Sequence, residues 1–264
     1  MKKRKKNALQ KTNRRRQRTS KPRLTLAMSN SFFRFKQFTV HQERCAMKVG
    51  TDGVLLGAWA NLDGARAILD VGCGSGLVAL MAAQRAPGAI IHAVEIDKEA
   101  CEQARENIDR SPWRDRVSLF EGPVQQFQPP RSYDVILCNP PFFVRSTPSP
   151  RPGKNIARHC ETLTHEELLV AAGRMIADGG TLQVILPVAE AERFARHAVS
   201  PTAGWRVNKT ALVLPNPGKA PKRLLLLLAR EEKTPEQETL IIENNRHDYH
   251  ESYRALTRDF YLNT

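Results

Sequence analysis

From Ala65 onward, short apolar segments of strand length alternate with segments of helical periodicity, and this alternation limits the fold most strongly. Such a pattern is typical of a mostly parallel sheet with helices on both faces. The last two apolar segments are joined by a short Pro- and Gly-rich stretch, 215–222, which has no room for a crossover helix and therefore predicts an antiparallel pair. The expected class is α/β, a doubly wound mostly parallel sheet ending in an antiparallel strand pair. The expected strands are 67–71, 90–95, 117–120, 133–138, 181–186, 207–214 and 223–229, and the expected helices are 77–85, 98–110, 164–176 and 189–199, with a helix stop at Gly179-Gly180.

The length and composition fit one soluble domain. A chain of 264 residues with 41% hydrophobic and 26% charged residues is typical of a globular protein. No stretch approaches the roughly 18 consecutive apolar residues that a membrane helix needs, so we expect no membrane partner. The five cysteines form no C-x-x-C pair, and no histidine lies at zinc-ligand spacing. We therefore expect reduced thiols, a cytoplasmic location and no metal. We also expect a monomer, in which an entry segment, 28–64, begins a single domain, 28–264.

The net charge of +14 is concentrated at the N-terminus. Residues 1–23 contain twelve Lys and Arg and no acidic residue, which leaves 29 of the 41 basic residues against 27 acidic ones in the rest of the chain. The folded part is thus nearly neutral, and we expect residues 1–27 to form a disordered basic tail. Three interpretations stay open: a tether for RNA phosphates, a solvated extension, or a segment that is not translated because Met28 is the true start.

A glycine-rich segment, Asp70-Val-Gly72-Cys-Gly74-Ser-Gly76, follows the first expected strand and precedes a helix. Glycines let the chain turn sharply and let a ligand approach the backbone, and ligands of such sheets bind at the carboxyl ends of the strands. A dinucleotide fingerprint would need glycine at position 77, where this chain has leucine. The G-x-G-x-G spacing instead resembles the S-adenosylmethionine-binding motif of Rossmann-like class I methyltransferases. The resemblance implies that Asp70, Gly72, Gly74 and Gly76 bind S-adenosyl-L-methionine.

An acidic residue ends the second expected strand. Glu95 lies nineteen residues after Gly76, and a carboxylate there can accept hydrogen bonds from both ribose hydroxyls of the cofactor. Its neighbour Asp97 is better placed to cap the helix that begins at Lys98. The alternative for either acid is a solvated strand end.

The end of the third expected strand departs from the family pattern. Methyltransferases of this type often place an aspartate there, which accepts a hydrogen bond from the cofactor adenine. Here Pro123 stands in that place and has neither a side-chain acceptor nor an amide donor. Two substitutes stay open, the side chain of Glu121 or a backbone carbonyl.

The tetrapeptide Asn139-Pro140-Pro141-Phe142 directly follows the fourth expected strand. An exocyclic amine on adenine is a poor nucleophile because its lone pair is delocalised into the ring. The Asn139 side-chain oxygen and the Pro140 carbonyl can each accept an N–H bond from that amine and orient its lone pair toward the methyl donor. Two prolines hold the loop rigid, and Phe142 offers a face for a flipped-out base. We therefore predict that these four residues are catalytic and that Asn139 also contacts the cofactor. The alternative is a rigid turn without a function.

The N-P-P-[FY] signature is shared by methyltransferases acting on DNA, on RNA and on protein glutamine amides, so it gives the reaction type and not the substrate. A longer pattern, FTVH at 38–41 and KVGTDGVLLGAW at 48–59, resembles the entry region of the bacterial tRNA(Val) adenine-N6 methyltransferase family, and the resemblance continues to YxALTxxFY at 253–261. It implies a tRNA substrate methylated on N6 of the adenine that follows the anticodon. It also implies that Lys48, Thr51 and Asp52 lie beside the methionine end of the cofactor. The alternative is that residues 51–53 only cap a helix.

Basic residues on the folded part give a weaker indication of RNA contact. They are Arg145, Arg151, Lys154 and Arg158 around a proline-rich loop beside the tetrapeptide, and Lys36 on the entry segment. Contact with tRNA phosphates and scattered surface charge are both open. Base flipping is easiest in a loop that is already single-stranded, which favours RNA over duplex DNA.

Two other functions stay open at this point. A protein glutamine-amide methyltransferase would present the same planar NH₂ group to Asn139. Its known members carry a separate N-terminal helical domain, whereas only about sixty residues precede the first expected strand here. The other possibility is a non-catalytic RNA-binding protein that has lost cofactor affinity, for which Pro123 is the one indication.

Overall fold

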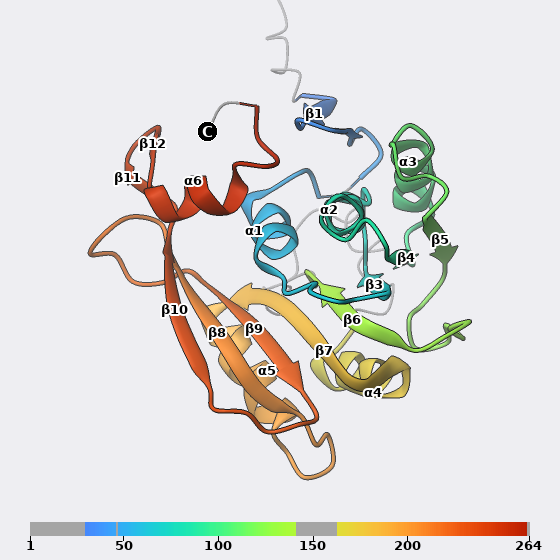
Figure 1. Cartoon of the computed structure of the whole chain (residues 1–264), viewed down its shortest axis with the longest axis vertical. Helices are drawn as coiled ribbons and strands as arrows, with labels where there is room; N and C mark the ends of the chain where they lie inside the picture. The colour runs from blue at the N-terminus through green and yellow to red at the C-terminus, as the bar shows by residue number, and fades with distance from the viewer. Residues whose placement is uncertain (1–29, 46, 141–162, 263–264) are drawn as a thin grey trace, which may run out of the picture. The chain divides into compact units, whose positions relative to one another are not determined.

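The computed structural model describes residues 30–45, 47–140 and 163–262. Its main sheet consists of β3 (Ala67–Val71), β4 (Ile90–Glu95), β5 (Val117–Glu121), β6 (Tyr133–Cys138), β7 (Ile176–Pro187), β8 (Arg206–Leu214), β9 (Arg223–Ala229) and β10 (Glu236–Ile241). The strand order is β10-β8-β9-β7-β6-β3-β4-β5 (Figure 1). Strand β9 is antiparallel to both of its neighbours, and the other neighbouring strands pair in parallel.

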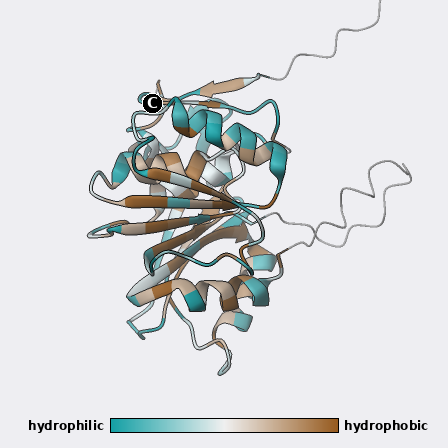
Figure 2. Cartoon of the chain, turned by 90° about the vertical axis from the view of Figure 1, so that its right-hand side faces the viewer, coloured by the Kyte–Doolittle hydropathy of each residue, from teal (hydrophilic) through white to brown (hydrophobic). Residues whose placement is uncertain are grey.

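Helices cover both faces of this sheet. The helices are α1 (Thr51–Trp59), α2 (Leu77–Arg85), α3 (Lys98–Asp109), α4 (His165–Met175), α5 (Val188–Ala198) and α6 (Glu251–Thr257), and the small hairpins are β1 (Phe32–Arg34) with β2 (Thr39–His41) and β11 (Glu243–Asn245) with β12 (Asp248–Tyr249). One core cluster joins the sheet to α1, α2, α3 and α6, and a second joins it to α4 and α5. Successive strand residues point to opposite faces, so Ile68 belongs to the first cluster and Leu69 to the second. Figure 2 shows the apolar strands lying between the two helical layers.

The fold class expected from the sequence is confirmed, including the antiparallel pair of β8 and β9. The sheet does not end with that pair, however, because β10 adds a further strand parallel to β8. Its first residues, Glu236 to Glu238, are polar, and Leu240 is its one buried side chain. A polar edge strand of this kind gives little hydrophobic periodicity, and for that reason it was not predicted.

The helix stop expected at Gly179-Gly180 is wrong. Helix α4 ends at Met175 and β7 begins at the next residue, Ile176, so both glycines lie inside a strand. The pairing register of β6 and β7 shifts there, which marks a bulge. Gly179 has a φ of 73°, and a Cβ on Gly180 would lie 2.9 Å from the carbonyl oxygen of Tyr133. The glycines therefore serve the bulge.

The cysteines of the described residues are free thiols, as expected for Cys45, Cys73, Cys101 and Cys138; Cys160 lies outside the described part. Burial raises the pKa of the Cys45 thiol to about 11 and that of Cys101 to about 12, which makes both poor nucleophiles at neutral pH. In the part of the chain that the structure describes, no helix is long and apolar enough to cross a membrane. The same residues contain no group of three or more His, Cys, Asp or Glu placed to hold a metal ion.

The close contact of α1 with α2 depends on a glycine. A Cβ on Gly57 would lie 2.7 Å from Met81 Sδ and 2.9 Å from Met81 Cβ. Overpacking of this kind costs about 1–3 kcal/mol, which exceeds the gain of about 1 kcal/mol that alanine brings to a helix. We therefore expect Gly57→Ala to lower the free energy of unfolding in urea. Gly88→Ala is the control, because a Cβ there meets nothing within 4 Å; equal stability of the two variants would contradict the packing argument.

Candidate functional site

Two loops of the candidate site leave the sheet side by side. The parallel pairing of β3 with β6 sets Val71 opposite Cys138, so the glycine loop, 72–76, and Asn139 begin at neighbouring strand ends. The strand order reverses at β3, and doubly wound sheets bind ligands at such a point. A Cβ on Gly53 would lie 3.8 Å from Asn139 Nδ2, so the first turn of α1 faces the same place.

The glycine loop leaves open space beside its backbone. Gly72, Gly74 and Gly76 have φ angles of 69°, 54° and 82°, which residues with a side chain rarely adopt. A Cβ built on Gly72 or Gly74 would meet no described atom within 4 Å. The loop therefore fits the predicted role, because a cofactor can approach its backbone there.

Asp70 links the strand before this loop to the helix after it. Its carboxylate is 1% exposed, and Oδ2 accepts a hydrogen bond of 2.9 Å from the amide of Ala79 in the first turn of α2. Burial raises the pKa of Asp70 to about 7, and the negative charge of Glu95 acts in the same direction. The contact gives Asp70 a positioning role, and its predicted contact with the cofactor stays a prediction.

The carboxylate of Glu95 binds the backbone around it. Oε2 accepts from the amide of Gly74 at 2.8 Å, and Oε1 accepts from the amides of Ile96 and Asp97 at 2.9 Å. A carboxylate has about four acceptor positions, so these contacts leave one of them, on Oε2, for a ribose hydroxyl. If Glu95 is to accept hydrogen bonds from both ribose hydroxyls, as predicted, one of these three backbone amides must stop donating to it. The cap predicted for α3 is confirmed, because Asp97 Oδ1 accepts from the amide of Ala100 at 2.8 Å.

Asn139 carries an unsatisfied acceptor. Its side-chain oxygen is buried and has no hydrogen-bond partner among the described residues. Leaving a buried polar atom unpaired costs about 1–3 kcal/mol, so such an atom calls for an explanation, and a missing ligand supplies one. Pro140 follows it and is buried. The predicted site residues Pro141, Phe142, Arg145, Arg151, Lys154 and Arg158 lie outside the described residues.

The alternative for residues 51–53 is a cap on a helix; a helix does begin at Thr51, but the side chains of these residues do not cap it. The N-cap is Gly50, and no side chain caps the helix. The side chain of Asp52 instead pairs with Arg223, whose Nε lies 2.8 Å from Asp52 Oδ2. Lys48 is exposed ahead of the helix. Sequence reasoning missed Arg223, because nothing in the sequence links the start of β9 to the start of α1.

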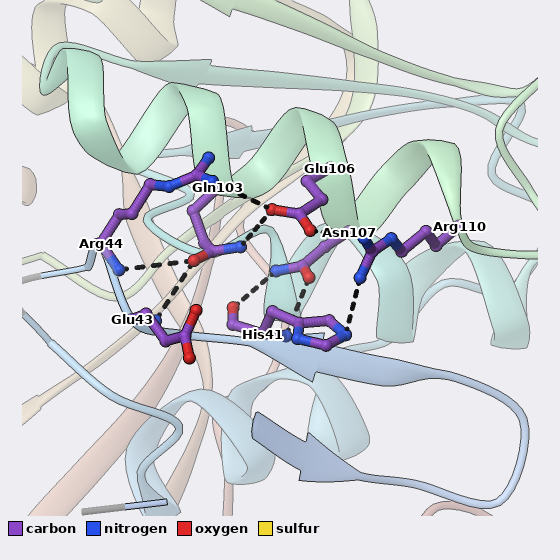
Figure 3. Close-up of polar contacts among 7 residues, drawn as sticks. All are labelled: His41, Glu43, Arg44, Gln103, Glu106, Asn107 and Arg110. Atoms are coloured by element: carbon purple, nitrogen blue, oxygen red, sulfur yellow. Dashed lines mark hydrogen bonds and ion pairs between the residues drawn. The ribbon is translucent and has the colours of Figure 1, made fainter. Parts of the chain in front are cut away.

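Two buried side-chain amides of α3 bind the entry segment, and Figure 3 shows their contacts with residues 41, 43 and 44. Asn107 Oδ1 accepts from the amide of His41 at 2.8 Å, while its Nδ2 donates to the carbonyls of His41 at 2.8 Å and of Ser75 at 2.9 Å. Gln103 Oε1 accepts from the amides of residues 43 and 44. Both side chains are 1% exposed. The entry segment is thus attached to the loop through Asn107.

The geometry at the end of β5 bears on which group accepts the hydrogen bond from the adenine amine of the cofactor. The Pro123 carbonyl already accepts from the amides of Gln126 at 3.0 Å and Phe127 at 3.2 Å, which occupies both of its lone pairs. Glu121 lies opposite Glu95 in the pairing of β4 with β5 and is exposed. This geometry argues against the Pro123 carbonyl as the backbone acceptor and favours the Glu121 side chain, the other substitute open from the sequence.

Known proteins resemble this chain over most of its length. The methyltransferase small domain family matches residues 49–192. The tRNA1(Val) (adenine(37)-N6)-methyltransferase of Bacteroides thetaiotaomicron is 45% identical over 236 residues, which cover 89% of this chain and 99% of that protein. A protein of the same name from Tolumonas auensis is 42% identical over 236 residues, which cover 89% and 98%.

Solved structures share the fold at low sequence identity. A predicted O-methyltransferase of Agrobacterium tumefaciens matches with a TM-score of 0.63 and 19% identity, covering 79% of this chain and 96% of that one. A putative class I S-adenosylmethionine-dependent methyltransferase of Listeria monocytogenes matches with a TM-score of 0.51 and 16% identity, covering 78% and 65%. The expected Rossmann-like class I methyltransferase fold is confirmed.

Replacing Asp70 by Asn tests the buried carboxyl. Its pKa rises from 3.8 to about 7 on folding, so the folded state holds the proton more tightly than the unfolded state does. The folded state is therefore not penalised below pH 4, and it loses stability as the pH rises toward 7. Asp70→Asn keeps an acceptor for Ala79 and cannot ionise. We expect its stability relative to wild type to be higher at pH 8 than at pH 5 by roughly 3 kcal/mol, measured by urea unfolding. A relative stability that is the same at both pH values would contradict this.

Proposed function

Because the chain belongs to the tRNA1(Val) (adenine(37)-N6)-methyltransferase family, we propose that it methylates N6 of an adenine in tRNA. The methyl donor is S-adenosyl-L-methionine, and the substrate is the adenine that follows the anticodon in the valine tRNA. The observation that carries the proposal is the buried, unpaired side-chain oxygen of Asn139 beside an open glycine loop. A planar amine with N–H groups to donate is the ligand that such an oxygen lacks.

Asn139 orients the amine of the substrate. When its oxygen accepts one N–H bond and the Pro140 carbonyl accepts the other, the nitrogen lone pair turns out of the plane of the ring. Both acceptors are buried, so their partial charges are weakly screened as positive charge develops on the nitrogen. The amine proton can leave after methyl transfer, so no residue needs to act as a strong base beforehand.

The residues around the glycine loop fit the cofactor. S-adenosyl-L-methionine supplies a methyl group on a positively charged sulfur. The glycine backbone and Glu95 would hold its nucleoside part. Lys48, Thr51 and Asp52 would hold its methionine part, and the Arg223 guanidinium fixes the Asp52 carboxylate. We also propose that the protein is a monomer and acts in the cytoplasm.

Asn139→Ala tests the assigned role. We expect turnover to fall by roughly 10²–10³-fold, because an acceptor that acts on the developing charge is lost. The dissociation constant of the cofactor should change far less than turnover, because the glycine loop, Glu95 and residues 48–52 would supply most of the cofactor contacts. Thermal stability should stay equal or rise, because the substitution removes a buried atom that has no partner.

Asn208→Ala is the matched control for Asn139→Ala. Asn208 is a buried asparagine whose amide, unlike the Asn139 oxygen, is paired, with Nδ2 donating to the Glu231 carbonyl and Oδ1 accepting from the Lys233 amide. This variant should lose stability and keep its turnover number. Methyl transfer to tRNA is measured with a labelled donor followed by nucleoside analysis. Near-normal N6-methyladenosine formation by Asn139→Ala would exclude the mechanism.

Glu121→Ala tests the adenine acceptor. We expect the cofactor product, S-adenosylhomocysteine, to bind roughly ten times more weakly, in line with the loss of a hydrogen bond to a charged group. The analogue with an unsubstituted purine lacks the donating amine and adds no polar group in its place, so its affinity should be the same for wild type and variant. Calorimetric titration of both ligands makes the comparison, and an equal loss for the two ligands would assign Glu121 a different role.

A further inference from the structure

A surface cavity of about 380 Å³ lies between the β1–β2 hairpin and the end of α3. Its lining includes Arg34, Lys36, His41 and Arg110, and none of the described residues that line it is acidic. Three permanent positive charges around one cavity predict an anionic ligand. These residues are remote in sequence from the glycine loop and Asn139.

The floor of this cavity is rigid and apolar. Phe35 and Phe38 are buried and stacked, with ring centres 4.6 Å apart, and the Phe35 amide donates to the Phe38 carbonyl at 2.8 Å. Tyr261 stacks on Phe35 at 5.9 Å, and Trp113 meets Phe38 edge-on at 5.5 Å. The hairpin that carries Arg34 and Lys36 is therefore held in place by the core before any ligand arrives.

Neighbouring acidic residues compensate the positive charges at the rim only in part. Arg110 lies 2.8 Å from Glu106, but the same carboxylate also faces Arg44 at 3.6 Å, so one negative charge is shared by two guanidinium groups. Arg110 donates to His41 Nε2 at 3.1 Å, which therefore acts as an acceptor (Figure 3). Lys36 donates from Nζ to a backbone carbonyl, a neutral partner.

We propose that this cavity binds backbone phosphates of the tRNA substrate at a distance from the reacting adenine, an inference that rests on the proposed function. The volume exceeds that of one phosphate and admits a segment of sugar-phosphate chain. The cationic side chains are largely exposed, 58% for Arg110, which suits a large ligand that covers them better than a small enclosed anion. Arginine and lysine contacts to phosphates supply much of the affinity of RNA-binding proteins and fix the register of the nucleic acid.

The test is the double substitution Arg34→Gln/Arg110→Gln in the full chain. We expect the dissociation constant for tRNA, followed by fluorescence anisotropy, to rise about tenfold at moderate salt. The slope of log affinity against log salt should become shallower by roughly 1.5, since each lost phosphate contact removes about 0.7–0.9. Cofactor affinity and turnover at saturating tRNA should not change. The variant Arg34→Lys/Arg110→Lys should keep most of the salt dependence, because it keeps the charges.

Arg193→Gln is the matched control. Arg193 is also 58% exposed and lies 3.0 Å from an acid on its own helix, Glu190, but it belongs to α5 on the other face of the sheet. The proposal would be overturned if the double glutamine variant bound tRNA with the same affinity and the same salt slope as Arg193→Gln. If wild type shows cavity-dependent binding of tRNA and yet transfers no methyl group to it, the proposed reaction is wrong and the phosphate site is supported.

Discussion

The parallel pairing of β3 with β6 is the constraint on which the site depends. It sets Val71 beside Cys138, so the glycine loop and Asn139 cannot separate without breaking the centre of the sheet. All five residues of β3 are buried, so apolar burial alone specifies its register weakly. Asp70 fixes the register of β3. A shift of one residue would turn its carboxyl away from the amide of Ala79 and bury it in the apolar cluster under α4 and α5.

A second layer of the site depends on buried polar groups. The amides of Gln103 and Asn107 are nearly inaccessible, and the amide of Asn107 is satisfied at both its oxygen and its nitrogen by backbone groups. A buried amide with all its partners specifies one arrangement, since any slip of the entry segment would leave it unpaired. The part of the entry segment that precedes α1 is therefore held in one arrangement, and α1 in turn faces Asn139.

The parts of the structure that are local in sequence were predictable. Strand and helix periods, the glycine loop and the position of Asn139 each depend on neighbouring residues. The predictions that failed concern contacts between residues distant in sequence, or residue types that occur in two kinds of local structure. Glycines at 179–180 are typical of a helix end but serve a strand bulge here. The pairing of Asp52 with Arg223 joins residues 171 positions apart, and no local sequence pattern predicts it.

Net charge was a poor guide to the surface of the folded part. Outside the N-terminal segment the basic and acidic residues nearly balance, 29 against 27, which indicated no preference for nucleic acid. At physiological salt, however, charges act over about 8 Å, so a ligand responds to the charges around one cavity and not to the total. The β1–β2 hairpin and α3 bring Arg34, Lys36 and Arg110 together although 76 positions separate the first from the last. A nearly neutral domain can thus present a cationic surface to tRNA because its fold separates the two signs of charge.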